Sequence, residues 1–440
     1  MDAILLSRMQ FAANITFHIL FPSISISLSW FLLFFKLKYS STGEEKWMDA
    51  YKLWVKIFAL GFAIGIVSGV TMPFQFGTNW PGFMNTFENV AGPMLAYEVL
   101  TAFFLEATFL GIMLYGHNRV SNSVHTFSTL LVALGTTFSA FWILSLNSWM
   151  QTPQGFEMID GKAYVTDWMQ VIFNPSFPYR LSHMLLASGL TSSFLIAGIS
   201  AYGHIGHKVY EGASAALKTG VYAAAILIPI QMFVGDMHGR NTLEYQPEKI
   251  AAMEGIWAKS ESPVALRLFA IPDDDEEKNF FELKVPHLGS LILTHSFDGE
   301  VKGIKSFENH PPVAPLFFSF RVMVGMGVLM LCIAWYCAFK LYRGNTLPKF
   351  ALYGLVAMTF SGWIATIAGW YTTEIGRQPW IVHGVMKTAD AATKIVPEDH
   401  VALTLSIYIS VYVFLLVSFV SVVFYLARSF QSTEDHAAQS

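Results

Sequence analysis

The chain has 440 residues, of which 54% are hydrophobic and only 13% are charged, and its formal net charge is −4. Soluble domains usually carry about 25% charged residues, so this composition excludes an ordinary soluble protein and indicates a helical membrane protein. The slight negative charge and the lack of a basic stripe argue against nucleic acid as a partner.

Nine apolar segments follow one another along the chain, and each is close to the roughly 20 residues that a helix needs to cross a bilayer. The first exceeds the apolar part of a signal peptide and has no small-residue cleavage site after it, so we expect a retained helix. The predicted spans are Phe11–Phe35, Ile57–Phe76, Met94–Leu114, Phe127–Leu146, His183–Tyr202, Val221–Val234 (extended to Met237), Leu316–Phe339, Phe350–Tyr371 and Val401–Ala427.

Basic residues mark alternate loops. They follow the first, third, fifth, seventh and ninth spans, as Lys36, Arg119, Lys218, Lys340 and Arg428 illustrate, whereas residues 77–91 contain neither lysine nor arginine. Because basic loops stay in the cytoplasm, the pattern predicts an all-α polytopic protein with its N-terminus outside and its C-terminus in the cytoplasm.

This topology divides the chain into four parts. Residues 1–238 form the first six helices, residues 239–315 a long outer loop, residues 316–428 the last three helices and residues 429–440 a cytoplasmic tail. The loop carries the acidic run Asp273–Glu277 and can be read as a solvated linker. We favour a functional loop because long ordered connections usually are functional.

A few polar side chains fall inside or at the ends of the predicted spans. An ionisable group at mid-bilayer costs roughly 2.5–3.5 kcal/mol on insertion scales, so such groups are functional candidates by default. The candidates are His18, Glu98, Glu106, His183, Arg321, Met323 and Glu374.

Histidine and methionine are axial ligands of haem iron, and a His/Met pair suits a low-spin haem that transfers electrons. His183 and Met323 both lie at the predicted outer ends of their helices, where one iron can bridge them. His18, alone at membrane depth, suits an iron with an open position. However, a membrane histidine can equally hydrogen-bond a neighbouring helix, and most methionines fill core space. Residue types alone therefore leave haem binding open.

Glu98 and Glu106 are eight residues apart in the third span, which separates them by about 12 Å along a helix. Their angular offset is moderate, so both can line one proton path. The alternative is that each pairs with a donor on a neighbouring helix. Arg321 can form a bidentate ion pair with a carboxylate or with a haem propionate.

Several local strings, in order from the N-terminus to about Trp380, resemble subunit I of cytochrome bd-type quinol oxidases. The last of them, just after Glu374, is the most diagnostic. The strings are Leu6-Ser7-Arg8-Met9-Gln10-Phe11, Phe74-Gln75-Phe76-Gly77-Thr78-Asn79-Trp80, Ala102-Phe103-Phe104-Leu105-Glu106, Val132-Ala133-Leu134-Gly135, Trp149-Met150-Gln151, Phe320-Arg321-Val322-Met323 and Gly376-Arg377-Gln378-Pro379-Trp380.

The resemblance implies ligands for three haems. It implies that His183 and Met323 hold a low-spin haem b. It also implies that His18 and Glu374 each hold one of two high-spin haems, a haem b and either a haem d or a further haem b. Arg321 and Arg377 match basic residues near haem propionates, and Trp370 matches an aromatic residue near the haems.

The same resemblance implies residues for proton transfer and quinol binding. Glu98 matches a carboxylate near the oxygen-reducing haem, and Glu106 and Ser139 match a proton path from the cytoplasm. Lys249 and Glu254 match the quinol-binding part of the outer loop, which is of the short form. Ala107 stands where some members have serine, which leaves the fine structure of the proton path open.

The implied function is that of a terminal respiratory oxidase in the bacterial cytoplasmic membrane. Such a subunit couples quinol oxidation at the outer face to the four-electron reduction of oxygen to water, and it builds a proton gradient without pumping. The implied partners are a homologous membrane subunit II and, as an open possibility, a small single-helix subunit. The quinone type and the d or b identity of the oxygen-binding haem stay open.

Three other functions compete with this reading. A solute or ion transporter would use Glu98, Glu106 and Arg321 but would give no role to His183 with Met323. A haem–copper oxidase would need more intramembrane histidines than the sequence offers. A membrane haem b protein that oxidises quinol without reducing oxygen would not need the third haem at His18.

Overall fold

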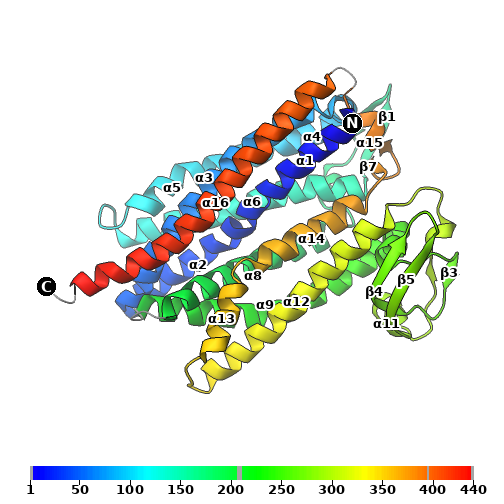
Figure 1. Ribbon diagram of the computed structural model, residues 1–440. Coiled ribbons are helices and arrows are strands. Elements are labelled where there is room, and N and C mark those ends of the chain that lie inside the picture. The colour runs from blue at the N-terminus through cyan, green and yellow to red at the C-terminus, as the bar shows by residue number, and fades with distance from the viewer. Residues whose placement is uncertain (1–2, 206–210, 394–395, 438–440) are drawn as a thin grey trace.

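The computed structural model describes residues 3–205, 211–393 and 396–437. Within these ranges nine helical segments are long and apolar enough to cross a membrane, which confirms the predicted number of spans. The start of the first helix and the end of the last lie at opposite ends of the bundle (Figure 1), as an odd number of crossings requires. Residues 438–440 of the predicted tail lie outside the described residues.

Three of the nine segments are interrupted helices and six are continuous. The interrupted segments are α1 (Ala3–His18) with α2 (Leu20–Thr42), α4 (Pro81–Glu98) with the π-helix η1 (Val99–Phe103) and α5 (Phe104–Tyr115), and α13 (Lys349–Ala357) with α14 (Ser361–Ile375). The continuous ones are α3 (Glu45–Thr78), α6 (Asn122–Gln151), α8 (Phe177–His204), α9 (Glu211–Tyr245), α12 (Val313–Tyr342) and α16 (Glu398–Ala437). Helix α9 continues past residue 238, where the sequence predicts the outer loop to begin.

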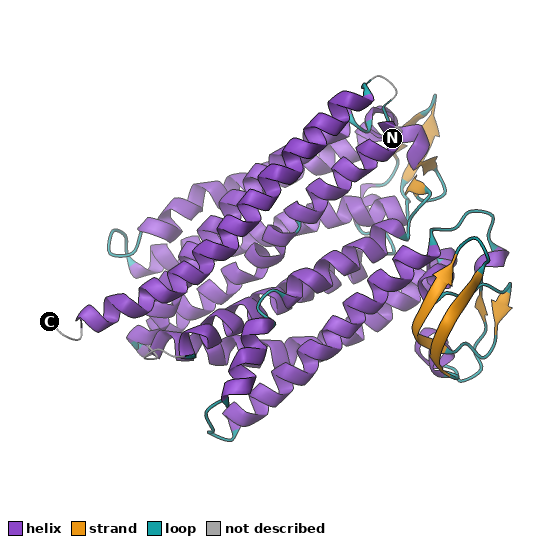
Figure 2. Ribbon diagram, in the orientation of Figure 1, coloured by secondary structure: helices purple, strands orange, loops and turns teal. Residues whose placement is uncertain are grey.

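The short elements gather at one end of the bundle, where Figure 2 shows every strand. The strands form antiparallel pairs, β1 with β2, β3 with β6, β4 with β5 and β7 with β8. The strands are β1 (Phe156–Ile159), β2 (Lys162–Val165), β3 (Ser260–Glu261), β4 (Leu266–Asp273), β5 (Lys278–Val285), β6 (Val301–Lys302), β7 (Trp380–Val382) and β8 (Met386–Lys387). The short helices are α7 (Trp168–Ile172), α10 (Pro247–Glu254), α11 (Leu288–Thr294), α15 (Thr388–Ala391) and the 3₁₀ turn η2 (Ile304–Ser306).

Prolines explain two local features of the spans. Proline has no N–H, so it frees the carbonyl four residues earlier. Pro22 follows His18 by four residues, and α1 gives way to α2 there. Pro229 lies inside α9, and the Nε1–H of Trp335 on α12 donates a hydrogen bond of 3.0 Å to the freed carbonyl of Ala225. An unpaired backbone group is costly in lipid, so this bond ties α12 to α9.

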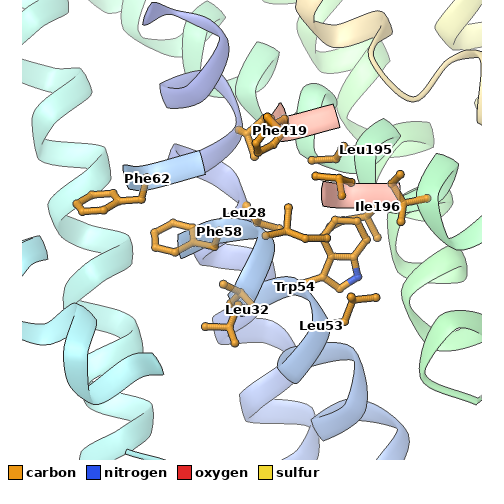
Figure 3. Packing of buried hydrophobic residues seen from close by; sticks show 14 of the residues in the cluster. Leu28, Leu32, Leu53, Trp54, Phe58, Phe62, Leu195, Ile196 and Phe419 are labelled. Carbon is orange, nitrogen blue, oxygen red and sulfur yellow. The ribbon is translucent and has the colours of Figure 1, made fainter. Parts of the chain in front are cut away.

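The spans pack as two groups that meet along α2 and α8. Helices α8 and α12 both pack against α9 and α14, helices α2 to α6 form the second group, and α16 lies against α1, α3 and α8. Large apolar side chains of α2 and α3 pack against α8 and α16 where the groups meet (Figure 3), and they include Leu28, Trp54, Phe58, Phe62, Leu195, Ile196 and Phe419. Hydrogen bonds join the helices as well, since Trp363 Nε1–H donates to the Leu20 carbonyl at 2.8 Å.

Candidate active site

His183 lies in the second turn of α8, near the end of the bundle that carries the strands. Its buried Nδ1 has no hydrogen-bond partner among the described residues, and its Nε2 lies 3.2 Å from the side-chain nitrogen of Gln231 on α9. A Cβ on Gly235 would lie 3.4 Å from the imidazole, so α9 keeps a glycine beside the ring. Buried polar atoms nearly always have a hydrogen-bond partner. Because Nδ1 of His183 has none among the described residues, this nitrogen is available to a ligand.

Met323 lies on α12, whose neighbours include α14 and α9. A Cβ on Gly369 of α14 would lie only 2.9 Å from the Met323 sulfur. Glycine therefore makes space for the thioether, as Gly235 does for His183. The two proposed ligands belong to one group of packed helices, α8, α9, α12 and α14, and their residue types fit the axial positions of a low-spin haem.

His18 ends α1 and points to α3. Its Nδ1 lies 3.0 Å from the Ser68 hydroxyl, and a Cβ on Gly69 would lie 3.1 Å from its ring. A metal-bound histidine usually has its second nitrogen held by a hydrogen bond, which fixes the ring orientation. Ser68 supplies that bond, so the Nε2 of His18 fits the role of an iron ligand.

Glu374, in the last turn of α14, is surrounded by positive charge. It accepts a hydrogen bond of 2.8 Å from Asn147 and a second one from Arg377. Arg180, which is only 6% exposed, donates a hydrogen bond of 3.5 Å from its guanidinium to the side-chain oxygen of the same Asn147. The Nε atoms of Arg180 and Arg377 are buried without a partner among the described residues. Guanidinium groups with unused donors fit the carboxylates of a haem propionate.

Lys249, in α10, is 3% exposed and reaches the same region. Its Nζ donates hydrogen bonds to Gln151 and Gln246 at 2.8 and 2.7 Å, and a Cβ on Gly376 would lie 2.7 Å from its side chain. Burial lowers the pKa of Lys249 well below its usual value, and the nearby positive charge of Arg180 lowers it further. Lys249 thus lies next to the segment that follows Glu374.

Glu98 and Glu106 both face α6. The Ser139 hydroxyl donates a hydrogen bond of 2.7 Å to Glu98. A Cβ on Gly135, one turn from Ser139, would lie 2.6 Å from the Glu106 side chain. Glu106 is buried, and its Oε1 has no hydrogen-bond partner within the described part of the chain. The two carboxyl groups therefore follow one face of α6, as a proton path requires.

The π-helix η1 explains why they share that face. Eight residues of regular α-helix would turn Glu98 and Glu106 about 80° apart. A π-helix accommodates one extra residue, and Val99–Phe103 lies between the two glutamates. The effective separation is then seven residues, which leaves an angle of about 20°. Such π-bulges occur frequently at functional sites.

Glu254 and Arg321 join the loop to the membrane helices. The Arg321 guanidinium on α12 pairs with Glu254 at 2.8 Å, donates to the Arg267 carbonyl and lies 3.6 Å from the Phe317 ring centre. Glu254 is buried at the end of α10. Although Lys249 and Glu254 share α10, they bind different neighbours, so the structure does not bring these two predicted quinol residues together.

The hairpin β4–β5 of the loop contains a compact charge cluster. Arg267 pairs with Glu261 at 2.7 Å and with Glu282 at 2.9 Å. Burial alone would raise the pKa of Glu282, but hydrogen bonds from Lys284, Asn279 and Arg267 outweigh it and lower the pKa from 4.5 to about 2. The ionised carboxylate therefore stabilises the hairpin.

This cluster predicts how the hairpin responds to acid. Because the pKa of Glu282 is lower in the folded protein, its contribution is complete above the unfolded value of 4.5 and is lost as the pH falls towards 2. Amide protection factors of β4 and β5, measured by hydrogen exchange between pH 7 and pH 2.5, should fall only below about pH 4.5. The Glu282→Gln variant should lose this dependence while the exposed-site variant Glu276→Gln keeps it. An unchanged acid response in Glu282→Gln would refute the role of this carboxylate.

Comparison with known proteins gives the same family throughout the chain. Residues 6–431 match the family model of cytochrome bd terminal oxidase subunit I. The chain belongs to the cytochrome bd terminal oxidase subunit I family. It is 35% identical to cytochrome bd ubiquinol oxidase subunit 1 of Bacillus subtilis (strain 168) over 89% of this chain and 86% of that protein. It is 31% identical to cytochrome bd-II ubiquinol oxidase subunit 1 of Escherichia coli (strain K12) over 100% and 98%.

A solved structure extends the likeness to the fold. The structure of bd oxidase from Geobacillus thermodenitrificans superposes with a TM-score of 0.90 at 30% identity, and the match covers 97% of this chain and 99% of the other. The chain is therefore a subunit of a quinol oxidase and a multi-pass protein of a bacterial membrane, and the family implies a complex with a subunit II. Membership in this family removes the transporter and the haem–copper oxidase as explanations.

Two residues of the site, the buried Arg180 and the half-buried His238, do not emerge from the sequence. Arg180 precedes the predicted start of the fifth span, and His238 follows the predicted end of the sixth, so neither was counted among the polar residues of the spans. The His238 ring lies 5.6 Å from that of His183. Trp370, by contrast, was predicted near the haems, and it lies half-buried on α14 between Gly369 and Glu374.

Proposed function

We propose that this chain oxidises quinol beside its strand-bearing loop, residues 239–315, at the outer face of the membrane. The oxidase then reduces oxygen to water inside the helical bundle. Quinol releases its protons outside and water formation takes protons from the cytoplasm, so a proton gradient forms without a pump. Family membership supports the terminal quinol oxidase, and the arrangement of the side chains supports the finer steps.

One observation supports the proposed quinol site more than any other. Arg321 pairs with Glu254 of the loop, and Met323 lies two residues further along the same helix. The carboxylate proposed to act on quinol is therefore connected through one arginine to the helix that carries a proposed iron ligand. A short path between the quinol and the first electron acceptor is what an electron-transfer subunit needs.

The residues present fit three haems. Haem iron, when bound, would supply the electron transfer and the chemistry of oxygen reduction. His183 and Met323 would hold a low-spin haem b, and His18 and Glu374 would hold the high-spin haem b and a haem d or further haem b. Arg180 and Arg377 would pair with propionates through their unused donors.

The remaining side chains handle protons. Glu254 accepts the proton of the quinol hydroxyl as a general base, and Arg321 holds its carboxylate in place. On the cytoplasmic side Glu106 takes up protons and passes them along α6 to Glu98, whose carboxylate Ser139 holds. The quinol role of Lys249 stays a prediction, because this side chain binds Gln151 and Gln246.

The complex extends beyond this chain. We propose that a homologous subunit II completes the oxidase and that a small single-helix subunit is an optional third component. The N-terminus lies outside and the C-terminus in the cytoplasm, because the basic loops are then inside.

The Glu254→Gln variant tests the proposed quinol site. We expect quinol-driven reduction of the enzyme to slow by about 100-fold, the lower end of the usual loss of a general base. Chemical reduction with dithionite should proceed to the same final spectrum, because the haems are still held. Stopped-flow absorbance with the two reductants measures both effects.

The matched control is Glu276→Gln, an exposed glutamate of the same loop that pairs only with Lys278 among the described residues. It should leave quinol oxidation unchanged. Normal quinol-driven reduction in Glu254→Gln would overturn the proposed base.

A further inference from the structure

A cavity of about 890 Å³ opens between α2, α3 and α9. It lies at the end of the bundle opposite to the strands, where α2 ends and α3 and α9 begin (Figure 1). None of the residues discussed for haem, quinol or proton transfer lines it. Its volume is within the range of roughly 300–1,000 Å³ that is typical of small-molecule sites.

The cavity is polar at its mouth and apolar further in. Lys38 lies four residues before the end of α2, and Lys46 is the second residue of α3. Trp30 lies twelve residues before the end of α2, and Ile226 lies fifteen residues after the start of α9. At 1.5 Å per residue the apolar walls therefore reach about 18–22 Å below the helix ends. This gradient follows that of a phospholipid, from headgroup to acyl chain.

The mouth carries more positive than negative charge. Among the described residues, Lys38, Lys46 and Lys218 line the cavity together with one carboxylate, Glu211. The Lys46 ammonium also pairs with Glu44 at 3.0 Å. Lys38 and Lys218 are exposed, and within the described part of the chain neither of them forms an ion pair with a carboxylate.

Aromatic rings hold the ammonium groups in place. The Nζ of Lys38 lies 5.7 Å from the Phe34 ring, and the Nζ of Lys46 lies 5.7 Å from the Trp47 ring. The Trp30 Nε1–H donates a hydrogen bond of 3.1 Å to the Thr137 hydroxyl of α6, and its ring lines the cavity. Tryptophan, lysine and arginine together are typical of the membrane–water interface.

We propose that this cavity binds the phosphate headgroup of an anionic membrane phospholipid, with one acyl chain along Trp30 and Ile226. Basic pockets between membrane helices on the cytoplasmic side are known to bind anionic lipid headgroups. The charge selects an anionic lipid over a neutral one, and the depth selects a lipid over a free anion. The site is independent of the quinol and haem sites.

The test uses the oxidase purified with its partner subunit and stripped of lipid by detergent washing. Phosphatidylglycerol and phosphatidylcholine are added back, and native mass spectrometry measures the lipid retained. Wild type should retain phosphatidylglycerol preferentially. The double variant Lys38→Gln/Lys218→Gln should bind it about 25-fold more weakly, about fivefold for each lysine near a membrane surface.

The matched control is Lys340→Gln/Arg343→Gln, which removes two basic residues at the basic end of α12 outside the cavity. This variant should bind like wild type. Equal binding of both lipids by wild type, equal loss in the two double variants, or displacement of the lipid by millimolar inorganic phosphate would each overturn the proposal. Occupation of the cavity by a small protein subunit in place of lipid would overturn it too. The comparison of lipids on wild type needs no variant, so it stands even where a variant fails to fold.

Discussion

The His183→Ala variant is expected to assemble without its low-spin haem b and to lose quinol oxidase activity. Removing a residue that only supports a metal ligand already costs about 10–100-fold, and loss of the ligand itself should exceed this. The buried imidazole has a nitrogen without a partner among the described residues and a glycine beside it on α9, so alanine would remove the nitrogen that is proposed to hold the haem. Visible spectra of the purified oxidase, with oxygen consumption driven by quinol, measure both losses.

The control is His204→Ala on the same helix. His204 binds the Ser200 carbonyl and the Ser214 hydroxyl at the opposite end of α8, and its loss should leave the spectrum intact. A normal low-spin band in His183→Ala would disprove the ligand assignment, and His238, 5.6 Å away, would then be the first alternative to examine.

The Glu106→Gln variant should keep its haem spectrum and lose turnover by about 10²–10⁴-fold, the usual range for a general acid–base group. Glutamine has nearly the same shape, so the packing against Gly135 is retained, but it cannot take up and release a proton. Quinol should still reduce the haems once, because electron entry at the loop does not need this path. Steady-state oxygen consumption and single-turnover reduction separate the two effects.

Glu88→Gln is a suitable comparison, since Glu88 lies on the same span but pairs with Lys162 at the exposed surface at 2.6 Å. Its turnover should match wild type. Should Glu106→Gln consume oxygen at the normal rate, protons reach the oxygen site by another path and the proposed role of this glutamate is wrong.

The membrane fold could be predicted from the sequence because a bilayer imposes one strong rule on it. A span must be long and apolar, and each of the nine predicted segments overlaps a membrane-length helix. The choice of His18 and Glu106 as candidates follows from the same rule, because placing an ionisable group at that depth costs free energy that a function must justify. The family strings then assigned roles that residue types alone left open.

Contacts between helices could not be predicted in this way. Hydropathy does not say which face of a helix meets which neighbour, so the bond between Arg321 and Glu254 and the position of Arg180 beside Asn147 appear only in the structure. Lys249 and Glu254 illustrate the same limit. They are five residues apart, which on a helix directs them about 140° away from each other.

The π-helix between Glu98 and Glu106 makes the proposed proton path depend on the backbone hydrogen-bonding pattern of one short segment, and not only on its side chains. If Val99–Phe103 formed regular α-helix with the same residues, the segment would be just as apolar and just as able to cross the membrane. The angle between Glu98 and Glu106 would nevertheless widen from about 20° to about 80°, which would turn Glu98 away from Ser139. The extra residue and the wider turn compensate each other, so a substitution that favours regular α-helix here can disturb the path without touching either glutamate.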